Sequence, residues 1–363
     1  MSHRAHGASV RRRGLIAAWA LVLIAGLAIT GCTHQKQIDP LADLDPIYVE
    51  VDPSGELPAT YYDAFILLQQ GNRAYNEQRF AQAEQLYGRL IETFPESEFA
   101  GLATYNFGLC LERQQRYSEA LDYYLRAGQL WPDDFEPHEV PLRRGSCLEQ
   151  LDRWSEAHAV YGEAAMLPGL APQQQLKLEA RAAIALYFAG QPSQAKQELR
   201  QVLEHYDELS RRIPLGRPTF IAQAYFVLGE VYYDQFSALN LNVPMEQMES
   251  TLEDKARLLL LARAQYLKAI RTHNPQWMTA SMYKIGLGYF ELREEILEAP
   301  LPDELDQEQQ QAYRDQLLEA VEPLRSKSLA VLKKNLNVAR QLDIDNEWVR
   351  LTRQIYEQIS EDQ

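Results

Sequence analysis

Residues 108–132, with the sequence GLCLERQQRYSEALDYYLRAGQLWP, decide the fold of this chain. The stretch carries small, aromatic and helix-ending residues at fixed positions: Gly108, Tyr117, Ala120, Tyr124, Ala127 and Pro132. Small residues let two helices cross closely, large aromatic residues fill the gaps beside the crossing, and proline ends the second helix. The stretch therefore predicts one pair of packed helices.

The same spacing recurs along the chain. One copy begins 37 residues earlier at Gly71, and another begins 37 residues later at Gly145. The earlier copy continues through Phe80, Ala83, Tyr87, Leu90 and Pro95, and the later one through Trp154, Ala157, Tyr161, Ala164 and, one place early, Pro168. Three partial copies open at Ala183, at Leu228-Gly229 and at Ile285-Gly286. A period of this length is typical of helical arrays whose units bury one continuous core.

This pattern resembles the tetratricopeptide repeat, whose unit is two antiparallel helices. The resemblance extends over most of the chain from Ala59 onward. It implies an all-α fold, namely a right-handed superhelical solenoid of about six helix pairs with inserts and a C-terminal capping helix.

The chain divides into four predicted parts. Residues 1–31 form a leader, 32–58 a linker rich in Asp and Pro, 59–275 the repeat array, and 276–363 a divergent final repeat with an insert and capping helices. Within the last part, the prolines and the acidic, Gln-rich composition predict a loop over 294–306 and a long helix over 307–342 that Pro323 interrupts. Asn346 is the predicted cap of a final helix.

The leader has the organisation of a bacterial signal peptide. Its first 14 residues are polar and basic, and Leu15 to Ile29 is apolar without a charge. Such a run spans roughly 22 Å as a helix, less than the ~30 Å hydrocarbon core, so a cleaved signal is favoured over a permanent transmembrane anchor. Arg12-Arg13 also resembles a loose twin-arginine signal, which leaves the export route open.

The apolar run ends at Ile29-Thr30-Gly31-Cys32. This ending resembles the lipobox of bacterial lipoproteins, in which the cysteine is acylated and becomes the mature N-terminus. The resemblance implies a lipid anchor on Cys32 that incorporates palmitate, and two or more acyl chains would make it stable. Because Thr33 rather than Asp follows the cysteine, the resemblance also implies the periplasmic face of the outer membrane in a Gram-negative cell.

Composition excludes several classes of function. From Cys32 onward, 32 Lys and Arg stand against 51 Asp and Glu. Nucleic-acid binding relies on cationic side chains that displace counterions, so no nucleic-acid partner is expected. The sequence lacks catalytic motifs, phosphate-binding loops and metal-ligand spacings, which predicts no enzyme activity, no cofactor, no metal site and no small-molecule substrate.

Neither the histidines nor the cysteines of the array form a cluster. His138, His158, His205 and His273 lie in separate repeats and are expected to be solvated or hydrogen-bonded surface residues. Cys110 and Cys147 occupy equivalent places in successive repeats, roughly 10 Å apart, beyond the reach of a disulfide. Both are therefore predicted to be buried thiols.

A solenoid presents a concave surface lined by the first helix of each pair. Helical spacing predicts a partner-binding groove on the faces turned away from the glycine crossings: Asn72, Tyr75, Tyr105, Asn106, Leu109, Glu112, Arg143, Tyr187, Phe226, Glu230, Tyr233, Tyr283 and Phe290. Exposed aromatic residues beside polar groups suit a partner's peptide or helix. The alternative is that the inserts or the superhelix itself bury several of them. If the groove is open, Tyr105→Ala and Tyr233→Ala should leave melting nearly unchanged, whereas Tyr124→Ala should unfold the array.

Three groove residues also resemble part of the peptide clamp in repeat domains that grip chaperone tails. In that family two asparagines bind the ligand backbone and three basic residues hold its terminal carboxylate. Asn72, Asn106 and Arg143 match three of those five places, but Leu68 and Glu139 stand where lysines belong. The resemblance therefore implies a backbone grip and argues against a carboxylate clamp.

The fifth repeat is split by about 21 extra residues between its two halves. Because the insert adds no complete helix pair, Phe236 to Asp254 is predicted to loop out of the stack as a separate surface. Deletion of 238–250 is then expected to lower stability little.

The C-terminal third adds a resemblance of its own. Pro300, Pro302, the Gln-rich helix and Asn346-Glu347-Trp348 look like the C-terminal half of envelope repeat proteins from gliding deltaproteobacteria. Together with the leader, this implies a lipid-anchored periplasmic scaffold that docks envelope proteins through the groove or the inserts. Gliding motility or surface transport, outer-membrane assembly and a pilotin-like role are the candidate settings. A periplasmic chaperone for transient clients and a regulator of a cell-wall enzyme are the alternatives.

Overall fold

The computed structural model describes residues 59–302 and 305–361, all of which belong to one compact unit. The leader, Cys32 and the linker lie outside these residues, as do the predictions made for them. Every element within the described ranges is helical, so the predicted all-α class is confirmed.

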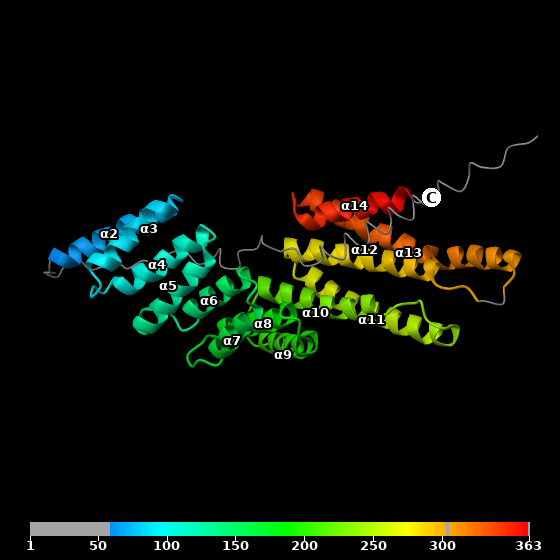
Figure 1. Cartoon of the computed structure of the whole chain (residues 1–363), viewed down its shortest axis with the longest axis horizontal. Helices are drawn as coiled ribbons and strands as arrows, with labels where there is room; N and C mark the ends of the chain where they lie inside the picture. The colour runs from blue at the N-terminus through cyan, green and yellow to red at the C-terminus, as the bar shows by residue number, and fades with distance from the viewer. Residues whose placement is uncertain (1–58, 303–304, 362–363) are drawn as a thin grey trace, which may run out of the picture. The chain divides into compact units, whose positions relative to one another are not determined.

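Over the described residues, the helices form six antiparallel pairs followed by a single last helix, each helix packed beside the next in chain order (Figure 1). The first three pairs are α2 (Ala59–Asn76) with α3 (Phe80–Thr93), α4 (Ala100–Arg113) with α5 (Tyr117–Leu130), and α6 (Glu139–Gln150) with α7 (Trp154–Ala165). A short 3-10 helix, η1 (Pro132–Asp134), connects α5 to α6.

The last three pairs are α8 (Pro172–Phe188) with α9 (Pro192–Ser210), α10 (Thr219–Ala238) with α11 (Met245–Arg271), and α12 (Pro275–Glu298) with α13 (Gln307–Gln341). The final helix is α14 (Glu347–Glu361), and it packs on both α12 and α13. Six pairs and a terminal helix are what the repeat spacing predicted.

In four of the six described pairs, the helices cross where a glycine of the first helix meets a tyrosine ring of the second. A Cβ on Gly108 would lie 2.8 Å from Tyr124, and one on Gly145 would lie 2.2 Å from Tyr161. Gly71 with Tyr87 and Gly229 with Tyr266 repeat the contact, at 2.5 and 2.4 Å. These positions favour glycine because the ring occupies the space that a larger side chain would need. The predicted packing of small residues against large aromatic ones, which we call the ladder, is therefore confirmed.

The turn between the two helices of a pair has the same backbone in the first four repeats. Gln78, Gln115, Asp152 and Gly190 have φ of 59°, 62°, 57° and 76°, and each stands seven residues after the crossing position. A left-handed residue here ends the first helix and directs following N–H groups onto its last carbonyls. In the second repeat, the Arg116 amide donates to the Leu111 carbonyl at 2.9 Å.

The sixth pair uses the same crossing with different residues. Gly286 faces Leu332 in place of a tyrosine, and a Cβ on Gly286 would lie 2.5 Å from it. Ser328, four residues before Leu332, stands where the other repeats carry alanine, and Asn335, three residues after it, stands where three of them do. Both are fully buried and bond to α12, with Ser328 Oγ donating to the Gly286 carbonyl at 2.7 Å. α13 therefore supplies the second helix that the spacing alone did not reveal.

The cap of the last helix is confirmed. The Val349 amide donates to Asn346 Oδ1 at 3.0 Å. Val349, Thr352 and Ile359 are buried on one face of α14, so this helix covers the end of the sixth pair. Pro323, by contrast, lies inside α13 without interrupting it, and α12 runs to Glu298, into the segment predicted as a loop.

The prediction for the insert in the fifth repeat is wrong. α10 continues to Ala238 and α11 already begins at Met245, so most of the extra residues lengthen these two helices. Phe236 and Leu241 are 0% and 3% exposed. The buried Lys255 donates to the carbonyls of Phe236 and Leu239 at 2.8 and 2.7 Å, and so satisfies the end of α10. The segment is thus a helical extension of the pair in which Phe236 and Leu241 are buried and most of residues 242–254 are exposed. Its deletion is expected to destabilise the pair, because it removes Leu239 and Leu241 at the end of α10.

Candidate partner-binding site

The structure places the predicted groove residues mainly in the interior. Nine are no more than 8% exposed: Asn72, Tyr75, Tyr105, Asn106, Leu109, Arg143, Phe226, Tyr233 and Phe290. The other four, Glu112, Tyr187, Glu230 and Tyr283, are half-buried. The expectation that these faces are exposed is therefore wrong, because residues of the following helices cover them.

The second and third pairs show how this burial arises. Tyr124 of α5 donates its hydroxyl proton to Glu112 Oε2 of α4 at 2.6 Å. We call the boundary between one helix pair and the next a seam. Arg143 of α6 reaches back across the seam between the second and third pairs, with Nη1 3.2 Å from Glu112 Oε1 and Nε 3.3 Å from the Tyr105 hydroxyl. Burial raises the pKa of the Tyr124 hydroxyl well above its usual value, and the Glu112 carboxylate adds to the shift. Tyr124 therefore stays a proton donor to Glu112.

Three other seams have the same arrangement, in which a side chain two residues before the crossing position meets a polar acceptor of the preceding repeat. Asn106 donates to Asn72 at 3.2 Å, Arg181 pairs with Glu149 at 3.3 Å, and Lys284 pairs with Glu230 at 2.8 Å. Tyr87 and Tyr266, the crossing tyrosines, donate to Asn72 and Glu230. Burial raises the pKa of Glu149 even with Arg181 beside it. We call this set the seam network.

The seam network also corrects the clamp resemblance. Asn72 Oδ1 already accepts from Tyr87 and from Asn106. Arg143 is 1% exposed and binds Glu112 and Tyr105. These three side chains therefore join neighbouring repeats to one another and do not form the exposed backbone grip that the match implied.

Most of the remaining groove residues have partners within the fold as well, although the bond between Tyr187 and Asp234 is exposed. Tyr75 accepts from Arg113 at 2.9 Å, Tyr187 donates to Asp234 at 2.8 Å, and Tyr233 donates to Glu291 at 2.6 Å. Phe226 packs among Tyr266, Trp277 and Trp348, with ring centroids 5.0 to 5.8 Å apart. Tyr283 also contacts Trp348, and Phe290 packs with Leu332 and Ile359.

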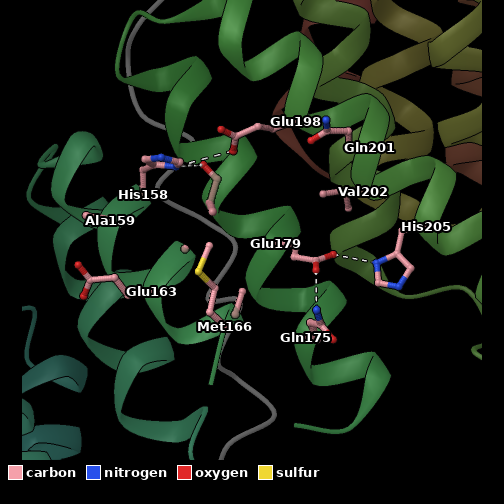
Figure 2. A pocket seen from close by; sticks show the side chains of 13 residues that line it. His158, Ala159, Glu163, Met166, Gln175, Glu179, Glu198, Gln201, Val202 and His205 are labelled. Carbon is pink, nitrogen blue, oxygen red and sulfur yellow. Dashed lines mark hydrogen bonds and ion pairs between the residues drawn. The ribbon is translucent and has the colours of Figure 1, made fainter. Parts of the chain in front are cut away.

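An open cleft lies elsewhere, among α7, α8 and α9 (Figure 2). Its volume is about 760 Å³, within the range of ligand-binding clefts. The cleft is lined by His158, Ala159, Gly162, Glu163, Ala165, Met166, Gln175, Glu179, Ala182, Glu198, Gln201, Val202 and His205. It is bounded by the second helices of two neighbouring pairs and one first helix, so it is a different surface from the predicted groove.

Two small residues create the cleft. In the first seam Phe107, one residue before its crossing glycine, covers Gly88, where a Cβ would lie 3.2 Å from the phenylalanine ring. Gly162 is the counterpart of Gly88 in the third repeat, and Ala182 is the counterpart of Phe107 in the fourth. A Cβ on Gly162 would meet nothing within 4 Å. The space filled by a ring in the first seam is therefore open in this one.

Carboxylates face this space. Glu179 binds His205 Nδ1 at 3.0 Å and accepts from Gln175 at 2.9 Å. Glu198 lies 4.0 Å from His158 Nδ1, which is itself 3.1 Å from the Ala182 carbonyl. Figure 2 shows the two carboxylates projecting toward the cleft from α8 and α9. No lysine or arginine occurs among the described lining residues; nearby Arg144 has its pKa lowered by burial and raised by the charge of Glu163.

An exposed apolar rim adjoins the cleft. Met166, at the end of α7, lines it and is 87% exposed, and the adjacent Leu167 is 42% exposed. Large apolar side chains that stand in solvent beside a cleft are typical of surfaces that another molecule covers.

The sequence pattern did not predict this cleft, because the cleft is marked only by a small residue at a position that is occupied by a large residue in other repeats. Only a register comparison shows it: the residue before the crossing is Phe107, Arg144, Leu228 or Ile285 in four repeats, and Ala182 in this one. His158 and His205 lie in separate repeats and are hydrogen-bonded, as expected, but nothing in the sequence indicated that they share a site. The fold brings both to one cleft.

Other kinds of site receive no support in the described part of the chain. No group of three or more His, Cys, Asp or Glu there is arranged to hold a metal ion. None of the described helices combines the length and the apolarity needed to cross a bilayer.

Comparison with known proteins bears on the repeats. Residues 68–135 match the tetratricopeptide repeat model, a span that covers most of the first two helix pairs. No curated protein matches the chain. The first two pairs are therefore similar to tetratricopeptide repeats, as the spacing implied.

Several solved structures of repeat proteins resemble the fold at low identity. MamA from Desulfovibrio magneticus RS-1 is 14% identical over 57% of this chain and 99% of its own, with a TM-score of 0.39. A tetratricopeptide repeat protein from Parabacteroides merdae is 12% identical over 80% of this chain and 99% of its own, with a TM-score of 0.41. YrrB, described as a repeat protein with an unusual peptide-binding site, is 18% identical over 55% of this chain and 90% of its own, with a TM-score of 0.36.

Proposed function

We propose that this chain is a lipid-anchored periplasmic scaffold that docks protein partners of a cell-envelope assembly. The observation that carries the docking role is the cleft among α7, α8 and α9, with the exposed Met166 at its rim. The seam network supports the same role, because the buried Arg181–Glu149 pair holds α8, one wall of the cleft, against α6 of the preceding pair.

The periplasmic location and the lipid anchor rest on the leader and on Cys32. In cells, Cys32→Ala is expected to abolish palmitate incorporation and to leave the chain soluble or uncleaved, since acylation and the following cleavage require the thiol. Palmitate labelling that persists in the variant would refute the anchor. Fractionation of inner and outer membranes then tests the proposed outer-membrane location.

Photo-crosslinking in intact cells tests docking. A photoreactive residue in place of Met166 is expected to capture a small, reproducible set of envelope proteins. The same residue in place of Leu342, which is 57% exposed and distant in sequence from the cleft helices, is the control. A heterogeneous set of clients at Met166 would favour the chaperone, and a single cell-wall enzyme would favour the regulator. Equal capture at both positions would show that the cleft is not the docking surface.

A further inference from the structure

We infer that the cleft among α7, α8 and α9 binds a cationic, amphipathic segment of a partner protein, with an apolar side chain in the space beside Gly162 and a lysine or arginine against Glu179 and Glu198. The inference rests on the proposed docking function and names the chemistry of the partner. Three properties of the cleft support it: the shape of its floor, the charge of its walls and the apolar surface at its rim.

The floor suits an apolar side chain. Ala159, Gly162 and Ala182 leave a hollow, and Val202, 5% exposed, lies against it. In the first seam the hollow of the same register contains the Phe107 ring, which approaches Gly88. A partner's leucine, methionine or phenylalanine could therefore occupy the open seam as Phe107 occupies the closed one, with favourable burial of apolar surface.

The walls suit a cation. Glu179 and Glu198 have no lysine or arginine partner within 4 Å among the described residues, and only histidine and amide groups contact them. A lysine or arginine extends an apolar stem along such a wall and places its charge at the carboxylates. Arginine can also bond a carboxylate with two parallel N–H groups.

The rim points to a protein segment and not to a small polyamine. Met166 and Leu167 extend the apolar surface beyond the cleft, where a compact cation would leave them uncovered. An amphipathic helix places an apolar residue and a basic residue three or four positions apart on neighbouring faces, which lets it cover the rim, the hollow and the carboxylates together.

Binding of a defined peptide to the purified full chain tests the inference. The probe is a fluorescent helical peptide with leucines on one face and arginines flanking them, measured by anisotropy at about 0.15 M salt, where long-range fields are screened. Glu198→Gln is expected to weaken binding about tenfold, as loss of a charge-assisted contact does. Gly162→Leu, which fills the hollow, is expected to weaken it at least as much.

Glu204→Gln is the matched control, because Glu204 is an exposed carboxylate on the same helix as Glu198 and does not line the cleft. It is expected to leave affinity unchanged. Equal losses in Glu198→Gln and Glu204→Gln would show attraction to the acidic protein as a whole and overturn the inference. So would full affinity in a folded Gly162→Leu chain; if that chain does not fold, the two glutamate variants decide.

Two further arms separate the sources of binding. A peptide with serine in place of leucine is expected to bind weakly, and spermine is expected to compete poorly. Spermine binding that equals the peptide's and depends on Glu198 would identify a polyamine site instead.

The crosslinking experiment separates this inference from the proposed function. If the peptide binds the cleft but Met166 captures no partner in cells, the proposed scaffold function fails and the inference stands. If Met166 captures a partner equally well in Gly162→Leu cells, the scaffold stands and the inference fails.

Discussion

Arg143 of α6 lies 3.2 Å from Glu112 of α4, across the seam between the second and third helix pairs, and its side chain is 1% exposed. Tyr124 donates to the other oxygen of the same carboxylate. One carboxylate thus joins its own repeat to the next. Such buried pairs determine which side chains of neighbouring repeats contact each other. Removing one partner is destabilising, because the charge of the other partner stays buried without compensation.

Arg143→Met is expected to lower the free energy of unfolding by about 3–5 kcal/mol, because the Glu112 carboxylate, 11% exposed, loses the guanidinium that lies 3.2 Å from it. Adding Glu112→Gln should recover part of the loss, since the uncompensated charge is then gone. Urea unfolding, monitored by circular dichroism, measures the free energy of unfolding of Arg143→Met and of the double variant. Arg153→Met breaks the exposed pair with Glu156 and should change little. Additive effects of the two buried substitutions would refute the coupling.

Tyr105→Ala is expected to destabilise the array about as strongly as Tyr124→Ala, by about 3–5 kcal/mol. This expectation reverses the one drawn from spacing alone. Tyr105 is 2% exposed, stacks on Phe135 with ring centroids 5.1 Å apart, and accepts a hydrogen bond from Arg143. Thermal melting is the measurement. Tyr313→Ala, at a 39% exposed position of α13, should stay within about 0.5 kcal/mol of the wild type.

The contrast between Tyr124 and Tyr105 shows how far the sequence could predict the structure. The spacing from Gly108 to Tyr124 recurs in several repeats, and one pair of helices explains it completely. The environment of Tyr105 depends on Arg143 and Phe135, which come from the next repeat and the connecting segment. Helical spacing predicts which face a residue occupies but not what the following helix places over that face.

The second helix of the sixth pair and the cleft were missed for two different physical reasons. Ser328 and Asn335 replace the alanines of the ladder, and their buried hydrogen bonds to α12 compensate for their polarity. Ala182 fits the ladder's preference for small residues, so nothing marks it until it is compared with Phe107 in register. A packing pattern identifies the contacts that exist, whereas a cleft arises where one is absent.

Gly145 of α6, which faces the Tyr161 ring, and Gly162 of α7, which follows Tyr161 in the chain, provide an opposed pair of variants. Gly145→Ala is expected to cost about 1–3 kcal/mol, since the new Cβ would lie 2.2 Å from the Tyr161 ring. Gly162→Ala should raise the free energy of unfolding by as much as about 1 kcal/mol, because its Cβ meets nothing within 4 Å and alanine favours the helix. Thermal melting of both variants checks the pair. A destabilised Gly162→Ala chain would mean that the cleft is closed.

The two thiols of the array report on its opening. Burial raises the pKa of Cys110 to about 12, and the charge of Glu84 adds to the shift. Cys147 is fully buried as well. Because the thiolate is the reactive form, a Cys32→Ala chain at neutral pH should show almost no reaction with a thiol reagent while folded. Both thiols should react in concentrated urea, and at intermediate urea the rate should rise with the fraction of open array. In the same chain, Cys110→Ser should leave Cys147 as a single thiol that reacts slowly with the reagent. Rapid labelling of either cysteine without denaturant would contradict the packing at Gly108 and Gly145.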